Sequence, residues 1–295
     1  MRWLVTGASG MLGTDLVDVL RRADEDVTAA TRATLDLSDP AAVLAGVAGH
    51  DVVVNTAAWT AVDDAEAHEA EAAEVNADVP RLLARAAREH SARLVHLSTD
   101  YVFDGSAGQP YAEDAPTAPA SAYGRTKALG EQAVREELPA GHLLVRTAWL
   151  YGAHGSCFPT TIARLARERG SVSVVDDQVG QPTWTRDVAG LVLALVRAGA
   201  PAGTYHATSS GRCSWFDFAR LVVAAAGLDP SAVQPTSSAA FVRPAPRPSY
   251  SVLGHEALHR LGLPPIASWD SRWAAAAPVV LSRAAAGGGT PRSPT

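Results

Sequence analysis

Three glycines near the start of the chain constrain its fold more than any other feature. Residues 3–6 form a short apolar run, followed by Gly7, Gly10 and Gly13 in GASGMLG and then by a segment with helical spacing. Glycine permits a tight turn and lets the backbone approach a phosphate group, which then lies against the helix N-terminus. A purely structural turn can have the same glycine spacing. The position of GASGMLG between a strand and a helix, however, favours a dinucleotide-binding loop.

Short apolar strands alternate with helices through the first half of the chain. We expect strands near residues 3–6, 27–30, 51–56, 94–98 and 143–147, and helices over 11–22, 40–47, 65–90 and 122–137. The long alanine-rich helix should break near Pro80. This alternation predicts βαβ units, and right-handed crossovers then give an α/β fold with a doubly wound parallel sheet of the Rossmann type.

After about residue 150 the alternation loosens into short strands separated by Pro- and Gly-containing loops. We therefore expect a dinucleotide-binding domain over residues 1–150. A smaller α/β substrate lobe over 151–283 should be interleaved with the last sheet elements. Residues 284–295 are small and polar, which predicts a disordered tail.

Composition excludes several classes of function. The 295 residues carry a net charge of −6, so the basic surface that nucleic acids require is missing, and we expect no nucleic-acid partner. No apolar run approaches the roughly 18 residues that cross a bilayer, and the N-terminal residues do not resemble a signal peptide. We expect a cytoplasmic protein without a membrane partner. Two cysteines make neither a disulfide framework nor a four-ligand zinc site, and no carboxylate cluster predicts another metal.

The basic residues are 24 arginines and a single lysine, Lys127, which stands four residues after Tyr123. This spacing places both side chains on one helix face. A phenol has a pKa near 10, and a neighbouring ammonium lowers that pKa, which makes tyrosine a usable acid or base. The compact ammonium of a lysine can also hydrogen-bond a nicotinamide ribose, a role for which the planar guanidinium of an arginine is unsuited. We therefore expect Tyr123 and Lys127 to be catalytic.

Two further positions suggest a substrate and a cofactor. Thr99 ends a buried strand at the carboxyl edge of the sheet, where doubly wound proteins bind ligands, and it can donate to a carbonyl oxygen beside Tyr123. Strand-end capping is the alternative role. The stretch after the second strand carries Arg32 and no acid, which favours the 2′-phosphate of NADPH and leaves NADH open. Asp36 is placed to accept from the adenine amino group.

Six segments resemble the extended short-chain dehydrogenases and, more closely, the dTDP-4-dehydrorhamnose reductase family of deoxysugar 4-ketoreductases. They are GASGMLG, NTAAWTAVDDAE (55–66), LSTDYVFDG (97–105), YGRTKALGE (123–131), RTAWLYG (146–152) and DQVGQPTW (177–184). The resemblance runs from residue 1 to about 273. It implies Thr99, Tyr123 and Lys127 as the catalytic triad.

The resemblance also implies binding residues. Those implied for the cofactor are Gly10, Met11, Leu12, Asp36, Leu37, Ala57, Ala58, Trp59, Thr60, Tyr123 and Lys127, beside Gly7, Gly13 and Arg32 from the arguments above. Those implied for the sugar nucleotide are Thr99, Asp100, Tyr101 and Trp149. Asn76 is expected to hold the backbone of the sheet. Arg247, in the Pro-rich segment 243–248, is a candidate for the diphosphate, with a solvated linker as the alternative.

The activity implied is NADPH-dependent reduction of the C4 ketone of a dTDP-4-keto-6-deoxyhexose. The alternatives are an NAD-dependent sugar-nucleotide epimerase and a non-catalytic subunit similar to that of methionine adenosyltransferase. A 4,6-dehydratase is disfavoured, because Tyr101 stands where such enzymes carry a glutamate. The partners expected are a dTDP-sugar and, in a homodimer, a second copy of the chain.

Overall fold

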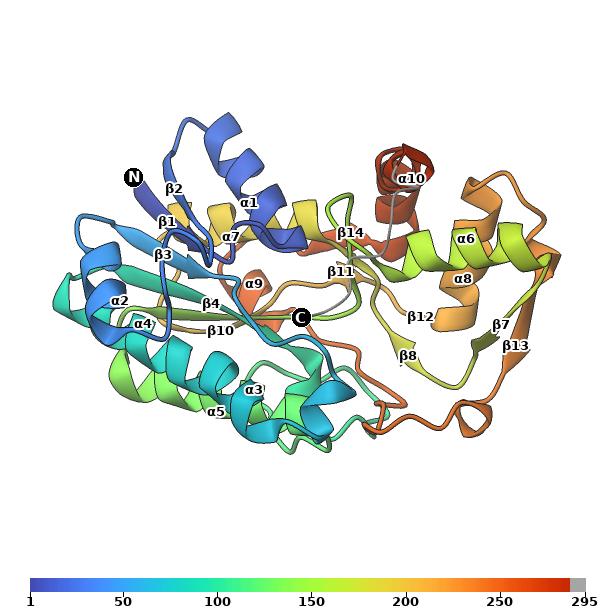
Figure 1. Cartoon of the computed structure of the whole chain (residues 1–295), viewed down its shortest axis with the longest axis horizontal. Helices are drawn as coiled ribbons and strands as arrows, with labels where there is room; N and C mark the ends of the chain where they lie inside the picture. The colour runs from blue at the N-terminus through green and yellow to red at the C-terminus, as the bar shows by residue number, and fades with distance from the viewer. Residues whose placement is uncertain (287–295) are drawn as a thin grey trace.

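A six-stranded parallel sheet forms the larger part of the protein. The computed structural model describes residues 1–286, and the strand order is β10-β5-β4-β3-β1-β2. Helices cover both faces of this sheet, and a smaller lobe adjoins one end of it (Figure 1). The predicted doubly wound α/β fold is confirmed.

The elements up to the fifth strand follow the predicted alternation. They are β1 (Arg2–Thr6), α1 (Met11–Arg22), β2 (Asp26–Ala30), α2 (Pro40–Val47), β3 (Val52–Asn55), η1 (Asp64–Glu66), α3 (Glu69–Ala73), η2 (Glu74–Asp78), α4 (Val79–Glu89), β4 (Arg93–Thr99), η3 (Asp100–Val102), α5 (Ala122–Glu137) and β5 (His142–Thr147).

The later elements are shorter and more varied. They are β6 (Leu150–Tyr151), α6 (Phe158–Arg169), β7 (Val172–Val175), β8 (Val179–Gly180), β9 (Thr183–Trp184), α7 (Thr185–Arg197), β10 (Gly203–His206), β11 (Ser209–Ser210), β12 (Cys213–Ser214), α8 (Trp215–Ala225), η4 (Pro230–Ala232), β13 (Val233–Thr236), η5 (Ser238–Ala240), α9 (Glu256–Arg260), β14 (Ile266–Ser268) and α10 (Trp269–Ala286).

Alternate side chains of each strand serve opposite faces of the sheet. Trp3 and Val5 of β1 join a core with α1, α7 and α9, whereas Leu4 joins a core with α2, α4 and α5. Because both faces are covered, the central strands β1 and β3 carry apolar runs, Trp3–Val5 and Val52–Val54, as is typical of parallel sheets. The smaller lobe has its own core, in which Tyr151 and Phe218 pack among α6, α8 and α10.

One prediction about helix ends is confirmed and one is wrong. The helix predicted over 65–90 is interrupted beside Pro80, as expected: the five-residue π-helical turn η2 ends at Asp78, and Pro80, which has no N–H to give to the preceding turn, is the second residue of α4. The predicted disordered tail began at 284, but α10 continues to Ala286, in keeping with the high helix propensity of alanine. The rest of that prediction, residues 287–295, lies outside the described residues.

Candidate active site

The glycine loop joins β1 to α1 and packs tightly against the segment after β3. Gly7 has a φ of +68°, and a Cβ there would lie 2.7 Å from the backbone nitrogen of Ala57. A Cβ on Gly13 would overlap the carbonyl oxygen of Gly7. Gly10 caps α1 without a side chain, which leaves the first N–H groups of that helix open. The loop therefore has the form of an anion cradle.

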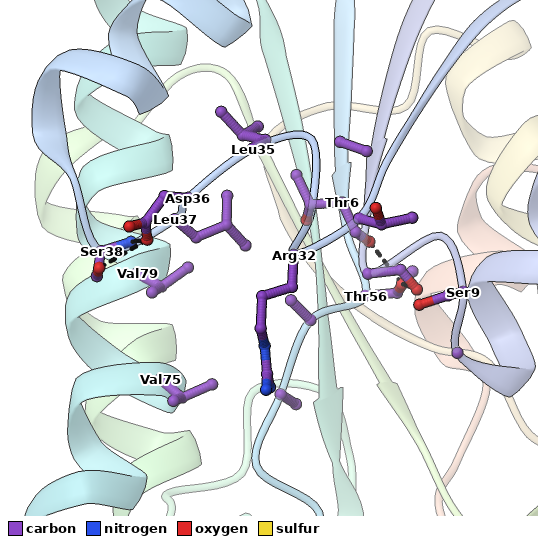
Figure 2. Close-up of a pocket in the computed structure, with 16 residues that line it drawn as sticks. Thr6, Ser9, Arg32, Leu35, Asp36, Leu37, Ser38, Thr56, Val75 and Val79 are labelled. Atoms are coloured by element: carbon purple, nitrogen blue, oxygen red, sulfur yellow. Dashed lines mark hydrogen bonds between the residues drawn. The ribbon is translucent and has the colours of Figure 1, made fainter.

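A cavity of about 730 Å³ opens beside this loop. It includes seven residues predicted to bind a cofactor: Gly7, Gly10, Arg32, Asp36, Leu37, Ala57 and Ala58. Figure 2 shows the Arg32 side chain extending through the space between the central strands and the helical segment that carries Val75. Arg32 forms no ion pair with any residue between 1 and 286. It is thus a free cation at the cavity.

The other predicted cofactor residues lie outside the lining of this cavity: Met11, Leu12, Gly13, Trp59, Thr60, Tyr123 and Lys127. Leu12 is buried in the core, and Met11 packs against the small lobe, where a Cβ on Gly152 would touch its side chain. The Trp59 backbone is held by Asn76, whose amide accepts from Trp59 N at 2.9 Å. Asn76 therefore fixes the loop after β3, where we had expected it to hold the sheet itself.

Thr99 and Tyr123 meet at the carboxyl edge of the sheet. Thr99 ends β4, and its hydroxyl donates to Asp100 Oδ1 at 2.9 Å. Tyr123 lies in the first turn of α5, which begins with Ser121 accepting from Gly124 N and with Glu66 accepting from Ala122 N at 2.8 Å. The N-terminus of the helix that carries Tyr123 is thereby anchored from two sides.

Lys127 is buried one turn further along α5. Its ammonium donates to Leu97 O at 2.7 Å and lies 3.5 Å from His96 Nε2. Burial lowers the pKa of Lys127 to about 8, against a smaller upward effect of the Glu131 charge. The side chain is still mainly an ammonium at pH 7.

The expected lowering of the Tyr123 pKa is not what the structure shows. Burial raises the pKa of this phenol above its usual value, and the Asp100 charge acts in the same direction. The hydrogen bond with Thr99 opposes both effects. Tyr123 and Lys127 are one helical turn apart on α5, as predicted. Their spacing in the sequence does not indicate that Lys127 Nζ donates to Leu97 O or that the Tyr123 phenol is buried. Tyr123 is therefore a protonated phenol, suited to giving a proton.

Asp100 and Tyr101 continue the site beyond Thr99. Burial raises the pKa of Asp100 to about 6, and its Oδ2 is buried without a hydrogen-bond partner in the described structure. The Tyr101 ring lies edge-on to the Tyr123 ring, with centroids 5.6 Å apart. Burial raises the pKa of Tyr101 to about 12, and the charge of Arg247 partly offsets this.

Trp149 lies where the sheet meets the small lobe. Its φ of +48° is unusual for a bulky residue. Its ring stacks on Trp215 at a centroid distance of 3.6 Å and an interplanar angle of 7°. A Cβ on Gly180 would lie 2.6 Å from Trp149 Cζ2, so a glycine is needed beside the ring. The strained backbone is thus supported by tight packing on two sides.

Arg247 reaches the sheet domain from the small lobe. Its Nη2 donates to Asp63 Oδ1 at 2.9 Å, and Arg243 donates to Asp63 Oδ2 at 3.1 Å. Arg247 Nη1 is buried without a hydrogen-bond partner in the described structure. The Pro-rich segment is therefore anchored at Asp63, unlike the solvated linker weighed as the alternative.

Comparison with known proteins is decisive for the family. The model of the RmlD substrate binding domain family matches residues 1–280. The chain belongs to this family. An RmlD-family relative, the probable dTDP-4,6-dihydroxy-2-methyloxan-3-one 4-ketoreductase of Streptomyces antibioticus, is 52% identical over 96% of both chains. The dTDP-4-keto-6-deoxy-D-glucose reductase of Streptomyces niveus is 51% identical over 95% of this chain and 97% of its own. The predicted resemblance is confirmed.

A solved structure agrees with this RmlD-family assignment. The dTDP-4-dehydrorhamnose reductase of Bacillus anthracis, in complex with NADP, has a TM-score of 0.90 and 36% identity, covering 93% of this chain and 98% of its own.

Several residues around the RmlD-family site were missed from the sequence. Trp215 follows Ser214 at the start of α8, and its aromatic character was the only signal. Asp63 lies in a motif that carried the resemblance, but its partners Arg243 and Arg247 stand 180 and 184 residues away. His96 and Asn55 lie on neighbouring strands, and their contact depends on a strand order that the sequence does not state.

Proposed function

We propose that this protein reduces the C4 ketone of a dTDP-4-keto-6-deoxyhexose with NADPH. The observation that carries the proposal is that Thr99 lies beside Tyr123, with Lys127 one turn further along α5, in an RmlD-family chain whose sheet also carries the glycine-lined cavity. The relatives named above as 4-ketoreductases and ketosugar reductases support it. The protein is accordingly an NAD(P)H-dependent oxidoreductase of deoxysugar biosynthesis.

The cavity fits a phosphorylated dinucleotide. The glycine cradle admits a pyrophosphate without side-chain obstruction, and Arg32 is a free cation that matches a 2′-phosphate. The NADP complex of the Bacillus anthracis relative supports the same choice. We assign to the cofactor the fourteen residues predicted from the sequence, with NADH as the weaker alternative.

Tyr123, Thr99 and Lys127 each have a separate role in the reduction. Bound NADPH supplies the hydride. Tyr123, a protonated phenol with a raised pKa, gives its proton to the oxygen that becomes the alcohol. Thr99 lies beside the phenol, and its hydroxyl, which donates to Asp100 Oδ1 in this structure, would turn to donate to the same oxygen. The Lys127 ammonium stabilises the phenolate that remains.

The sugar nucleotide would lie between the sheet edge and the small lobe. Asp100 and Tyr101 continue the catalytic strand, and Trp149 offers an aromatic face. Arg247, with one unpartnered N–H group, is the candidate for the diphosphate. On this basis we keep residues 1–150 as the cofactor domain and 151–283 as the substrate lobe, although β10 completes the large sheet and α7 packs against α1.

Two expectations remain predictions. The homodimer is tested by analytical ultracentrifugation, and the cytoplasmic location by cell fractionation. No helix between residues 1 and 286 is long and apolar enough to span a membrane. No group of three metal-ligating side chains occurs in the same range.

The direct test measures NADPH oxidation with a panel of dTDP-4-keto-6-deoxyhexoses. We expect one NADPH consumed for each ketosugar reduced, whereas an epimerase would return its nucleotide unchanged. Tyr123→Phe should lower kcat by about 10²–10⁴-fold. The matched control is Tyr205→Phe, which removes a hydroxyl bonded to Pro201 O far from the site and should leave kcat unchanged.

Undiminished turnover by Tyr123→Phe would refute the mechanism. A regulatory subunit would show no turnover with any ketosugar and would keep its effect on a partner in the Tyr123→Phe variant.

A further inference from the structure

A buried chain of polar groups crosses the sheet and ends at the catalytic lysine. Thr6 Oγ1 donates to Asn55 Oδ1 at 2.7 Å, Asn55 Nδ2 lies 3.1 Å from His96 Nδ1, and His96 Nε2 lies 3.5 Å from Lys127 Nζ. The four side chains are at most 2% exposed. Thr6, Asn55 and His96 are register partners on the adjacent strands β1, β3 and β4, so the sheet itself aligns them.

The amide of Asn55 determines which nitrogen of His96 carries the proton. The backbone N–H of Ala57, which can only donate, points at Asn55 Oδ1 from 3.1 Å. The oxygen therefore faces Thr6 and Ala57, and the NH₂ group faces His96. Nδ1 of His96 must accept that hydrogen bond.

His96 is neutral in this setting. Burial and the Lys127 charge hold its pKa well below the usual value. A neutral imidazole has one protonated nitrogen, and Nδ1 is an acceptor here, so the proton is on Nε2. The group that faces Lys127 is consequently an N–H donor.

A donor beside Lys127 Nζ has a specific electrostatic effect. An ammonium has three donors and no lone pair, so it can bond Leu97 O but not the protonated Nε2. A neutral amine has a lone pair that can accept from Nε2. The His96 contact therefore favours the amine form of Lys127 over the ammonium.

Most of the other charges near α5 are paired with another group or exposed to solvent. The charged and titratable groups on the elements packed against α5 are Asp64 and Glu66 on η1, Glu69 and Glu71 on α3, Glu74 and Asp78 on η2, Arg81, Arg85, Arg88 and Glu89 on α4, Arg93 and His96 on β4, Asp100 and Tyr101 on η3, and His142 and Arg146 on β5. Asp64, Glu71, Glu74, Asp78 and Glu89 are exposed. Glu66 binds Ala122 N, Glu69 pairs with Arg125, and the α4 arginines pair with acids near the end of α5. On α5 itself, Tyr123 is neutral and Glu131 is held by Arg146.

We propose that His96 is a positioning residue of the catalytic site. Asn55 holds it as the Nε2–H tautomer, and it presents a donor to Lys127 Nζ. This directs the remaining lysine N–H groups away from the strand and favours release of the lysine proton. The proposal deepens the proposed function, since it concerns the lysine assigned to catalysis there. Thr6 and Ala57 line the cofactor cavity, so the same chain links that cavity to Lys127.

The single lysine makes the test direct. Growth with ¹⁵N-labelled lysine gives one side-chain Nζ signal, and its pH titration reports the pKa of Lys127 in the intact protein without any assay of activity. We expect a midpoint near 8 in the unmodified chain. A midpoint at or above the usual lysine value of about 10.4 would overturn the proposal, whether or not any variant folds.

His96→Asn is the informative variant. Its amide oxygen can take the place of Nδ1 and accept from Asn55, while the donor aimed at Lys127 is lost. We expect the lysine midpoint to rise by at least one pH unit. The matched control is His206→Asn, which removes another buried histidine, on β10, and should leave the midpoint unchanged. An unchanged midpoint in His96→Asn would reduce His96 to a packing residue and refute the proposal.

Two further readouts separate the possible failures. In ¹⁵N-histidine spectra, the signals that disappear in His96→Asn must belong to a ring with a bare Nδ1 and a protonated Nε2, and the opposite tautomer overturns the proposal. The alkaline limb of kcat/KM should move upward with the lysine midpoint. If the midpoint moves and the limb does not, the role of His96 stands and the catalytic role of Lys127 is refuted.

Discussion

Replacing Glu131 by glutamine removes the charge that the most buried guanidinium of the sheet depends on. Glu131 is on α5, and its carboxylate accepts from Arg146 Nε at 2.8 Å and from Arg146 Nη2 at 2.7 Å. The Glu131 side chain is 0% exposed and that of Arg146 is 1% exposed. Arg146 keeps only Glu113 O at 3.2 Å and the Phe103 ring at 4.8 Å. Glu131→Gln therefore leaves a buried cation without a counter-charge.

The size of the effect follows from this geometry. Breaking a buried ion pair by removing one partner costs about 3–5 kcal/mol. Glutamine keeps one oxygen acceptor, so we expect the lower end, a loss of about 3 kcal/mol in the free energy of unfolding. For a chain of this size that corresponds to a fall in Tm of about 6 °C. Urea unfolding followed by circular dichroism measures the free energy, and calorimetry measures the Tm.

The control on the same helix is Glu136→Gln. Glu136 is 50% exposed and lies 3.5 Å from Arg81, so this change should cost less than about 0.5 kcal/mol. The double variant Glu131→Leu with Arg146→Met removes both charges and should be more stable than Glu131→Gln. A loss below about 1 kcal/mol in Glu131→Gln, or a double variant less stable than it, would refute the reasoning.

Three other changes test the cofactor loop and the buried carboxyl. Gly13→Ala puts a Cβ onto the Gly7 carbonyl oxygen and should weaken NADPH binding at least tenfold by fluorescence titration; an unchanged Kd contradicts the close packing. Arg32→Ala should raise the Kd for NADPH by about 10–100-fold, from one charge-assisted bond of about 1.5–3 kcal/mol, and leave that for NADH unchanged; equal losses would place Arg32 elsewhere. The pKa of Asp100 is about 6 in the native state against an ordinary value of 3.8, so the native state binds the Asp100 proton more tightly than the unfolded state does. This tighter binding stabilises the native state below pH 4, and the stabilisation is lost as the pH rises to 6. Asp100→Asn should therefore gain about 2–3 kcal/mol relative to the parent between pH 4 and pH 7 in urea unfolding, and a constant difference would contradict it.

The sequence by itself determined the local features. The glycine spacing after an apolar run specifies the turn between β1 and α1, because only glycine fits where Gly7 has positive φ and Gly13 packs on its carbonyl. The interval from Tyr123 to Lys127 is one helical turn in any helix. The alternation of short strands with helices predicts the parallel sheet, since each strand needs a crossover to reach the next. Each of these features depends on a sequence pattern that is local along the chain.

Tertiary structure alone decided which distant groups meet. Thr6, Asn55 and His96 align because β3 lies between β1 and β4 in register, and neither strand order nor register is visible in the periodicity of one strand. The pairing of Asp63 with Arg247 spans 184 residues. The raised pKa of Tyr123 likewise comes from burial, which depends on every element packed around the phenol and not on the helical turn that separates it from Lys127.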